Sequence, residues 1–195
     1  MSDTRPPRKR RIPRPATQER LRKAALYYID RYSTSAGNLR EVLMRRVTKS
    51  VRLHGTEPDE GRQWVEEIVA DLVTRGLVDD RAYAETRAVS LHRGGASKRK
   101  IAMALRSKGV GPADVEAALS ALEESHRNSE FSAARNYARR RRFGPWRPAD
   151  EREARRERDL AAMARAGFSY SMAQRVIDAP DIDALERDVA ENGLD

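Results

Sequence analysis

The sequence contains no cysteine, which excludes disulfide bonds and zinc sites with thiolate ligands. It also has little apolar material: 39% of the chain is hydrophobic, with three Phe and two Trp among 195 residues. Because this content cannot fill one thick core, we expect thin helical layers that cover one another's apolar faces. No apolar run approaches the ~20 residues of a membrane-spanning helix, and the N-terminus lacks the apolar segment of a secretory signal. The sequence therefore predicts a cytoplasmic protein.

The residue groups that carry common catalytic chemistry are also absent from the sequence. His54, His92 and His126 are far apart, and none stands at metal-ligand spacing from a second His or a Cys. Residues 94–98 read GGASK, which lacks the spacing of a phosphate-binding loop. We find no nucleophile with a partner base. The sequence therefore argues against an enzyme, and it predicts no catalytic residue, no metal and no cofactor.

The net charge of +9 is concentrated in two segments. Residues 1–14 hold six bases and one acid, and residues 135–158 hold ten Arg and four acids, which leaves the rest of the chain close to neutral. Concentrated positive charge indicates a partner with dense negative charge, and nucleic acid is the usual one. The alternative interpretation is a solubilising tail together with a solvated Arg-rich helix.

One helical pattern recurs along the chain. Residues 97–110 read SKRKIAMALRSKGV, and residues 35–47 match them as a diverged copy when Ser35 is placed on Ser97. Each copy has a serine that can cap a helix, apolar residues at four-residue spacing and a basic outer face. A weaker third copy precedes residues 167–168. Such a repeat predicts a helical repeat protein with an extended binding surface.

The apolar spacing predicts nine helices, and no strand alternation is visible. We therefore predict an all-α fold of tandem three-helix repeats that form an elongated, curved array. The second helix is expected to end near Val47, before a polar loop over 49–61, and Leu105 is expected in the core. The predicted divisions are a disordered basic, Pro-rich tail over 1–16, three-helix repeats over 17–78, 79–128 and 129–180, and an acidic C-terminal tail over 181–195.

Basic side chains on two predicted helices, and the loop after the second, are the candidates for binding nucleic acid or a partner protein. Four consecutive Arg over 139–142 point around most of a helix, so that some must face solvent. Trp146 follows in a Pro/Gly loop, where its ring can stack on a base. The candidates are Lys98, Arg99, Lys100, Lys108, Arg139, Arg140, Arg141, Arg142, Trp146 and Arg147.

In residues 72–84, LVTRGLVDDRAYA, a predicted helix ends at Gly and an apolar pair, and an Asp precedes an aromatic-Ala helix. This pattern resembles the signature of the RecX family of regulators of the RecA recombinase. Residues 97–110 are similar to its basic helix, and residues 165–169, RAGFS, to its closing motif. The resemblance covers residues 20–178. It implies a curved protein of three-helix repeats that lies in the groove of the RecA–DNA filament and blocks strand exchange, the coprotease role and ATP turnover. We expect a monomer.

Two functions fit these observations. The first is negative regulation of RecA by binding to its filament, supported by non-specific contact with single-stranded DNA and with double-stranded DNA. The alternative is a basic DNA-binding or nucleoid-associated helical protein with no RecA contact, which the Arg run and the pI of 10.2 favour. The two differ in whether the protein acts on RecA–DNA filaments at a salt concentration where it no longer binds bare DNA.

Overall fold

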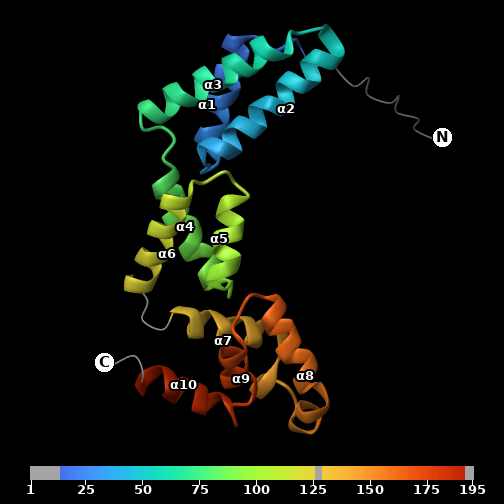
Figure 1. Ribbon diagram of the computed structural model, residues 1–195, viewed down its shortest axis with the longest axis vertical. Helices are drawn as coiled ribbons and strands as arrows, with labels where there is room; N and C mark the ends of the chain where they lie inside the picture. The colour runs from blue at the N-terminus through green and yellow to red at the C-terminus, as the bar shows by residue number, and fades with distance from the viewer. Residues whose placement is uncertain (1–13, 126–128, 192–195) are drawn as a thin grey trace, which may run out of the picture. The chain divides into compact units, whose positions relative to one another are not determined.

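The computed structural model describes residues 14–125 and 129–191, and over these residues the chain is helical with no strand (Figure 1). The predicted all-α fold is confirmed. Its helices are α1 (Gln18–Arg31), α2 (Ala36–His54), α3 (Pro58–Thr74), α4 (Asp80–Arg93), α5 (Lys98–Arg106), α6 (Pro112–Ser125), α7 (Ser129–Arg141), α8 (Ala149–Arg165), α9 (Tyr170–Ile177) and α10 (Ile182–Glu191), with a short 3-10 turn, η1 (Gly144–Trp146), before α8. Among the described residues, no helix has both the length and the apolar content needed to cross a membrane.

The chain divides into two compact units, of which unit 1 ends at Val78 and unit 2 begins at Asp79. In unit 1, α1, α2 and α3 each turn one apolar stripe inward, and all three pairs of helices are in contact. Gly61 lets α2 and α3 approach closely, because a Cβ there would lie 2.4 Å from Cγ1 of Val47. The fully buried large side chains of this core are Leu21, Leu39, Leu43, Val47, Ile68 and Leu72.

Helix α2 continues to His54, so the prediction that it ends near Val47 is wrong. The inward stripe goes on through Ser50, which is buried and whose Oγ accepts a hydrogen bond of 2.7 Å from the Ala16 backbone N–H. Gly55 ends the helix in the left-handed conformation. The predicted loop over 49–61 is therefore reduced to residues 55–57. Ala16 is itself buried, which corrects the predicted tail at that residue; residues 1–13 lie outside the described residues.

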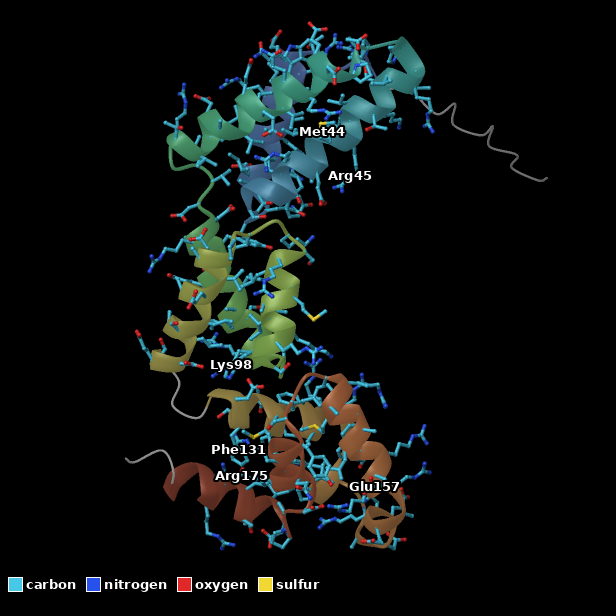
Figure 2. The ribbon with its side chains drawn as sticks, in the orientation of Figure 1. Met44, Arg45, Lys98, Phe131, Glu157 and Arg175 are labelled. Atoms are coloured by element: carbon cyan, nitrogen blue, oxygen red, sulfur yellow. The ribbon has the colours of Figure 1, made fainter. Side chains whose placement is uncertain are left out.

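Unit 2 contains two cores. Helices α4, α5 and α6 enclose the first, which includes Ile101, Leu105 and Leu122. Helices α7 to α10 enclose the second, which includes Phe131 and Met163. Figure 2 labels Phe131 and Arg175, whose guanidinium carbon lies 4.4 Å from the centroid of the Phe131 ring. The two groups of helices touch through α4 and α7.

The chain forms a helix, α10, where the acidic tail over 181–195 is predicted, so that residues 14–125 and 129–191 hold ten α-helices where the sequence predicts nine. Asp181 caps this helix by accepting a hydrogen bond of 2.7 Å from the Ala184 backbone N–H. Leu185 is 2% exposed and joins the second core of unit 2, which anchors the helix. Residues 192–195 lie outside the described residues.

Five helices end with the same pair of hydrogen bonds, the Schellman motif, in which the residue after the cap adopts a positive φ. At the end of α5, for example, the Val110 N–H donates to the Leu105 carbonyl and the Gly109 N–H donates to the Arg106 carbonyl. The positive-φ position is glycine at the ends of α3, α4, α5 and α8. At the end of α7 it is Arg142, the one non-glycine residue with a positive φ in the described chain.

Candidate nucleic-acid and partner interface

Helix α5 is held by its N-cap residue. The Ser97 Oγ accepts a hydrogen bond of 3.3 Å from the Lys100 N–H and donates one of 2.7 Å to the Ala166 carbonyl, which belongs to the end of α8. The inward face then buries Leu105, which confirms the prediction for that residue. The outward face carries exposed bases together with Met103, which is 60% exposed. Ser97 therefore both starts α5 and fixes it against α8.

Two glycines bring α5, α7 and α8 together. Gly95, with φ of 81°, lies so near α7 that a Cβ there would be 2.8 Å from the Tyr137 backbone nitrogen. Gly167, with φ of 93°, lies so near the start of α5 that its Cβ would be 2.6 Å from the Ser97 Oγ. A side chain at either position would push the helices apart. Arg140 adds a hydrogen bond of 2.7 Å from its Nη1 to the Gly94 carbonyl.

These approaches form a small basic–aromatic pocket of about 220 Å³. Lys100 of α5 and Arg141 of α7 flank the Tyr137 ring, with Nζ at 5.7 Å and Cζ at 5.8 Å from its centroid. Arg165 at the end of α8 is the third cation of the lining, which contains no acid. Cations near a ring face interact with its π system, and three of them together attract an anionic group such as a phosphate. The pocket is lined by Lys100, Tyr137, Arg141, Phe143, Ala162, Arg165 and Ala166.

Seven of the ten candidate residues lie exposed. On α5 and at its end these are Arg99, Lys100 and Lys108, and at the end of α7 they are Arg139 to Arg142. The structure brings Lys100 and Arg141 into one pocket, although 40 positions separate them in the sequence. Arg140 is exposed but is also hydrogen bonded to Gly94.

Three predicted interface residues are engaged within the fold instead. Lys98, labelled in Figure 2, is half-buried and forms an ion pair with Glu123. Trp146 is half-buried and packs against the second core of unit 2. Arg147 has only 18% of its side chain exposed and donates hydrogen bonds of 3.0 and 3.2 Å to the buried Asp159 carboxylate. Those hydrogen bonds raise the pKa of Arg147 above its usual value, which indicates a structural role.

Sequence reasoning missed Tyr137 and Arg165, which complete the basic–aromatic pocket. The sequence analysis singles out neither residue as a binding candidate, and Arg165 enters it only as part of the motif over 165–169. Neither residue differs locally from many other Tyr and Arg residues on amphipathic helices. Their joint position depends on the close approaches at Gly95 and Gly167, which one sequence does not reveal. Among the described residues, no group of three His, Cys, Asp or Glu side chains is arranged to hold a metal ion.

Known proteins similar to this chain share a family. A family model described as RecX, second three-helix domain, matches residues 79–119. The regulatory protein RecX of Myxococcus xanthus (strain DK1622) is 48% identical over 168 residues, which cover 86% of this chain and 89% of the relative. The regulatory protein RecX of Agrobacterium fabrum (strain C58 / ATCC 33970) is 33% identical over 156 residues, which cover 80% of each chain.

A crystal structure of a regulatory protein RecX superimposes with a TM-score of 0.60 over 83% of this chain and 72% of that chain. At 22% identity this likeness shows the fold alone. The sequence similarity reaches further, because the Myxococcus relative matches over nearly its whole length. The chain belongs to the RecX family of regulatory proteins, which are not enzymes.

Proposed function

We propose that this chain is a negative regulator of the RecA recombinase, which binds the groove of the RecA–DNA filament and inhibits ATP turnover, strand exchange and the coprotease role. The observation that carries the proposal is the similarity, over nearly the full length, to proteins named regulatory protein RecX. The chain supplies no chemistry of its own in this role. It acts by occupying a surface that RecA protomers need in order to move against one another.

Several small surfaces suit this task better than one deep pocket. The chain presents separate helical groups, each with its own core. A filament repeats the same protomer along its length, so one chain can contact more than one protomer. Linked contacts raise the overall affinity because each later contact forms at a high effective concentration.

Contact with DNA supports the binding to the filament. In this proposal the basic–aromatic pocket and the exposed Arg run over 139–142 face the nucleic acid. Each phosphate neutralised on a single strand changes the slope of log K against log salt by about −0.7. DNA contact is therefore strongest at low salt, whereas apolar and hydrogen-bonded contacts with RecA persist at higher salt.

The alternative function is a basic DNA-binding protein with no RecA contact, and the same pocket favours it. Co-sedimentation with RecA filaments separates the two functions, at a salt concentration where the chain no longer binds bare DNA. Regulation of RecA predicts that the chain sediments with the filament under that condition. A chain that stays in the supernatant with filaments, and binds only bare DNA at low salt, contradicts the proposal and supports the alternative.

Substitution of Lys100, Arg141 and Arg165 by Gln tests the role of the basic–aromatic pocket. A matched control replaces Arg87, Arg155 and Arg158, which are exposed in unit 2 and lie outside this pocket. Both variants lose three positive charges. If the pocket contacts DNA, the first variant binds single-stranded DNA more weakly than the control does, and the slope of log K against log salt flattens by about 2. Equal losses assign the effect to net charge alone.

A further inference from the structure

Unit 1 has a basic hollow of its own, the α2 groove. It lies between the start of α1 and the second half of α2, with a volume of about 560 Å³. Arg45, labelled in Figure 2, is one of its lining residues. The lining contains five cations and no acid: Arg14, Arg20, Arg45, Arg46 and Lys49, together with Pro15, Ala16, Leu21, Val42, Ser50, Leu53 and His54.

The cations of the α2 groove differ from most others in unit 1 by their lack of compensation. Elsewhere in the unit several bases form close ion pairs, such as Arg22 with Asp71 at 2.6 Å and Arg40 with Glu66 at 2.8 Å. Arg46 and Lys49 form no ion pair with any described residue, and Arg45 approaches Glu41 only to 4.0 Å. Residues 42–54 contain no acid at all. The groove therefore presents positive charge that the fold does not neutralise.

The shape and chemistry of the groove fit a sugar–phosphate backbone. Arg45 and Lys49 stand four residues apart, so that they project from one side of α2 about 6 Å apart along its axis. Between the charged rims lie apolar groups, with Leu53 44% exposed. No Phe, Tyr or Trp lines the groove and His54 is the one aromatic side chain of the lining, so stacking is limited and sequence preference is not expected. A groove of this kind follows the backbone of a single strand by charge.

The sequence before the groove adds charge of the same sign. Arg14 belongs to the lining, and the thirteen residues that precede it include five further bases and one acid. A density of positive charge this high matches a ligand with one negative charge per monomer along its whole length, which favours nucleic acid over an acidic protein segment.

We propose that the α2 groove is a binding site for the backbone of single-stranded nucleic acid, separate from the basic–aromatic pocket of unit 2. The site does not depend on the regulation of RecA, because bare nucleic acid is its ligand. Its tests accordingly contain no RecA, and their failure leaves the proposed function untouched.

The first test measures the salt dependence of binding. The full chain is titrated into a fluorescent 20-nucleotide oligo-dT at several salt concentrations, and anisotropy gives the affinity. Substitution of Arg45, Arg46 and Lys49 by Gln is expected to flatten the slope of log K against log salt by about 2, since three phosphate contacts of about 0.7 each are lost. The matched control replaces Arg31, Arg62 and Arg75, exposed bases of unit 1 outside the groove. Equal flattening in both variants, or none in the groove variant, overturns the proposal.

A charge-preserving variant, Arg45→Lys with Arg46→Lys, guards against misreading a folding defect. It is expected to retain the slope of the unaltered chain, because the slope depends on the number of phosphates that positive charges neutralise, and lysine keeps the charge. Thermal unfolding of all variants checks that the fold is intact. We expect little change in Tm, because the substituted positions are exposed. If the lysine variant loses as much affinity as the glutamine variant, the proposed charge contact is wrong.

The second test locates the ligand. Because the chain has no cysteine, Leu53→Cys places one thiol in the groove, and Leu77→Cys places one at an exposed position of unit 1 outside it. Saturating oligo-dT is expected to slow maleimide labelling at position 53 several-fold and to leave position 77 unchanged. Equal labelling at position 53 with and without oligo-dT overturns the proposal. If a poly-glutamate peptide slows labelling at position 53 and oligo-dT does not, the groove binds acidic protein segments and the proposal is wrong. If a 20-base-pair duplex slows labelling as much as oligo-dT does, the groove has no preference for single strands.

Discussion

Replacement of Arg142 by Gly is expected to stabilise the protein. Arg142 has a φ of 55° and ends α7 with the hydrogen bonds that other helices form around glycine. The Cβ of an L-residue costs roughly 1–2 kcal/mol in the left-handed conformation, whereas glycine costs about 0.5–1 kcal/mol through the greater freedom of the unfolded chain. The difference predicts a gain of about 0.5–1 kcal/mol in the free energy of unfolding.

Thermal unfolding followed by circular dichroism measures this gain, which corresponds to a rise in Tm of roughly 2–6 °C for a unit of this size. Arg142→Ala is the control, because it removes the same guanidinium but keeps a Cβ in the left-handed backbone. It is expected to leave the Tm unchanged or slightly lower. If the Gly variant melts below the Ala variant, the backbone conformation is not the cost that we infer, and the side chain itself stabilises the end of α7.

Four further variants test the core, the surface of α5, the buried ion pair and the Arg run. Leu105→Ala is expected to lower the free energy of unfolding in urea by about 2–5 kcal/mol because Leu105 is fully buried. Lys98→Ala is expected to lower it by about 1 kcal/mol or less because the ion pair of Lys98 with Glu123 lies at the surface. Equal losses in the two variants contradict the orientation of α5. Asp159→Ala is expected to cost about 2–4 kcal/mol in the same assay, since it removes the buried carboxylate of Arg147 and leaves only the more distant, exposed Glu151. A cost below about 0.5 kcal/mol contradicts that role. Replacement of all four Arg over 139–142 by Gln is expected to weaken binding of single-stranded DNA in anisotropy titrations and to flatten its salt dependence, whereas an unchanged slope assigns this charge to solubility.

The sequence was most informative where periodicity and capping agree. In α5, Ser97 and the apolar residues four apart determine the start of the helix and its buried face, and both follow from local rules. The sequence prediction ends α2 too early because the inward stripe of the helix passes through Ser50. This polar residue is buried, and its Oγ accepts a hydrogen bond from the Ala16 backbone N–H. A polar residue on the inward face interrupts the apolar pattern by which a helix is read.

Two other features depend on packing between distant segments. Helix α10 is rich in acids and was read as a tail, but Leu185 fits into a core that only the folded unit provides. The basic–aromatic pocket joins Lys100 to Tyr137 and Arg165 through the backbone approaches at two glycines. Amphipathic spacing predicts which face of a helix is buried; it does not predict which exposed side chains of different helices meet.

The DNA-dependent ATPase of RecA from the same organism, titrated with the full chain at moderate salt, tests the proposed regulation most directly. Inhibition well below one chain per RecA protomer is expected if the chain caps growing filament ends, and inhibition only near saturation is expected if it lines the groove. Both outcomes agree with negative regulation, and a parallel strand-exchange assay is expected to fall with the ATPase. If ATP turnover and strand exchange are unaffected while the chain still binds bare DNA, it does not regulate RecA, and the DNA-binding alternative replaces that function.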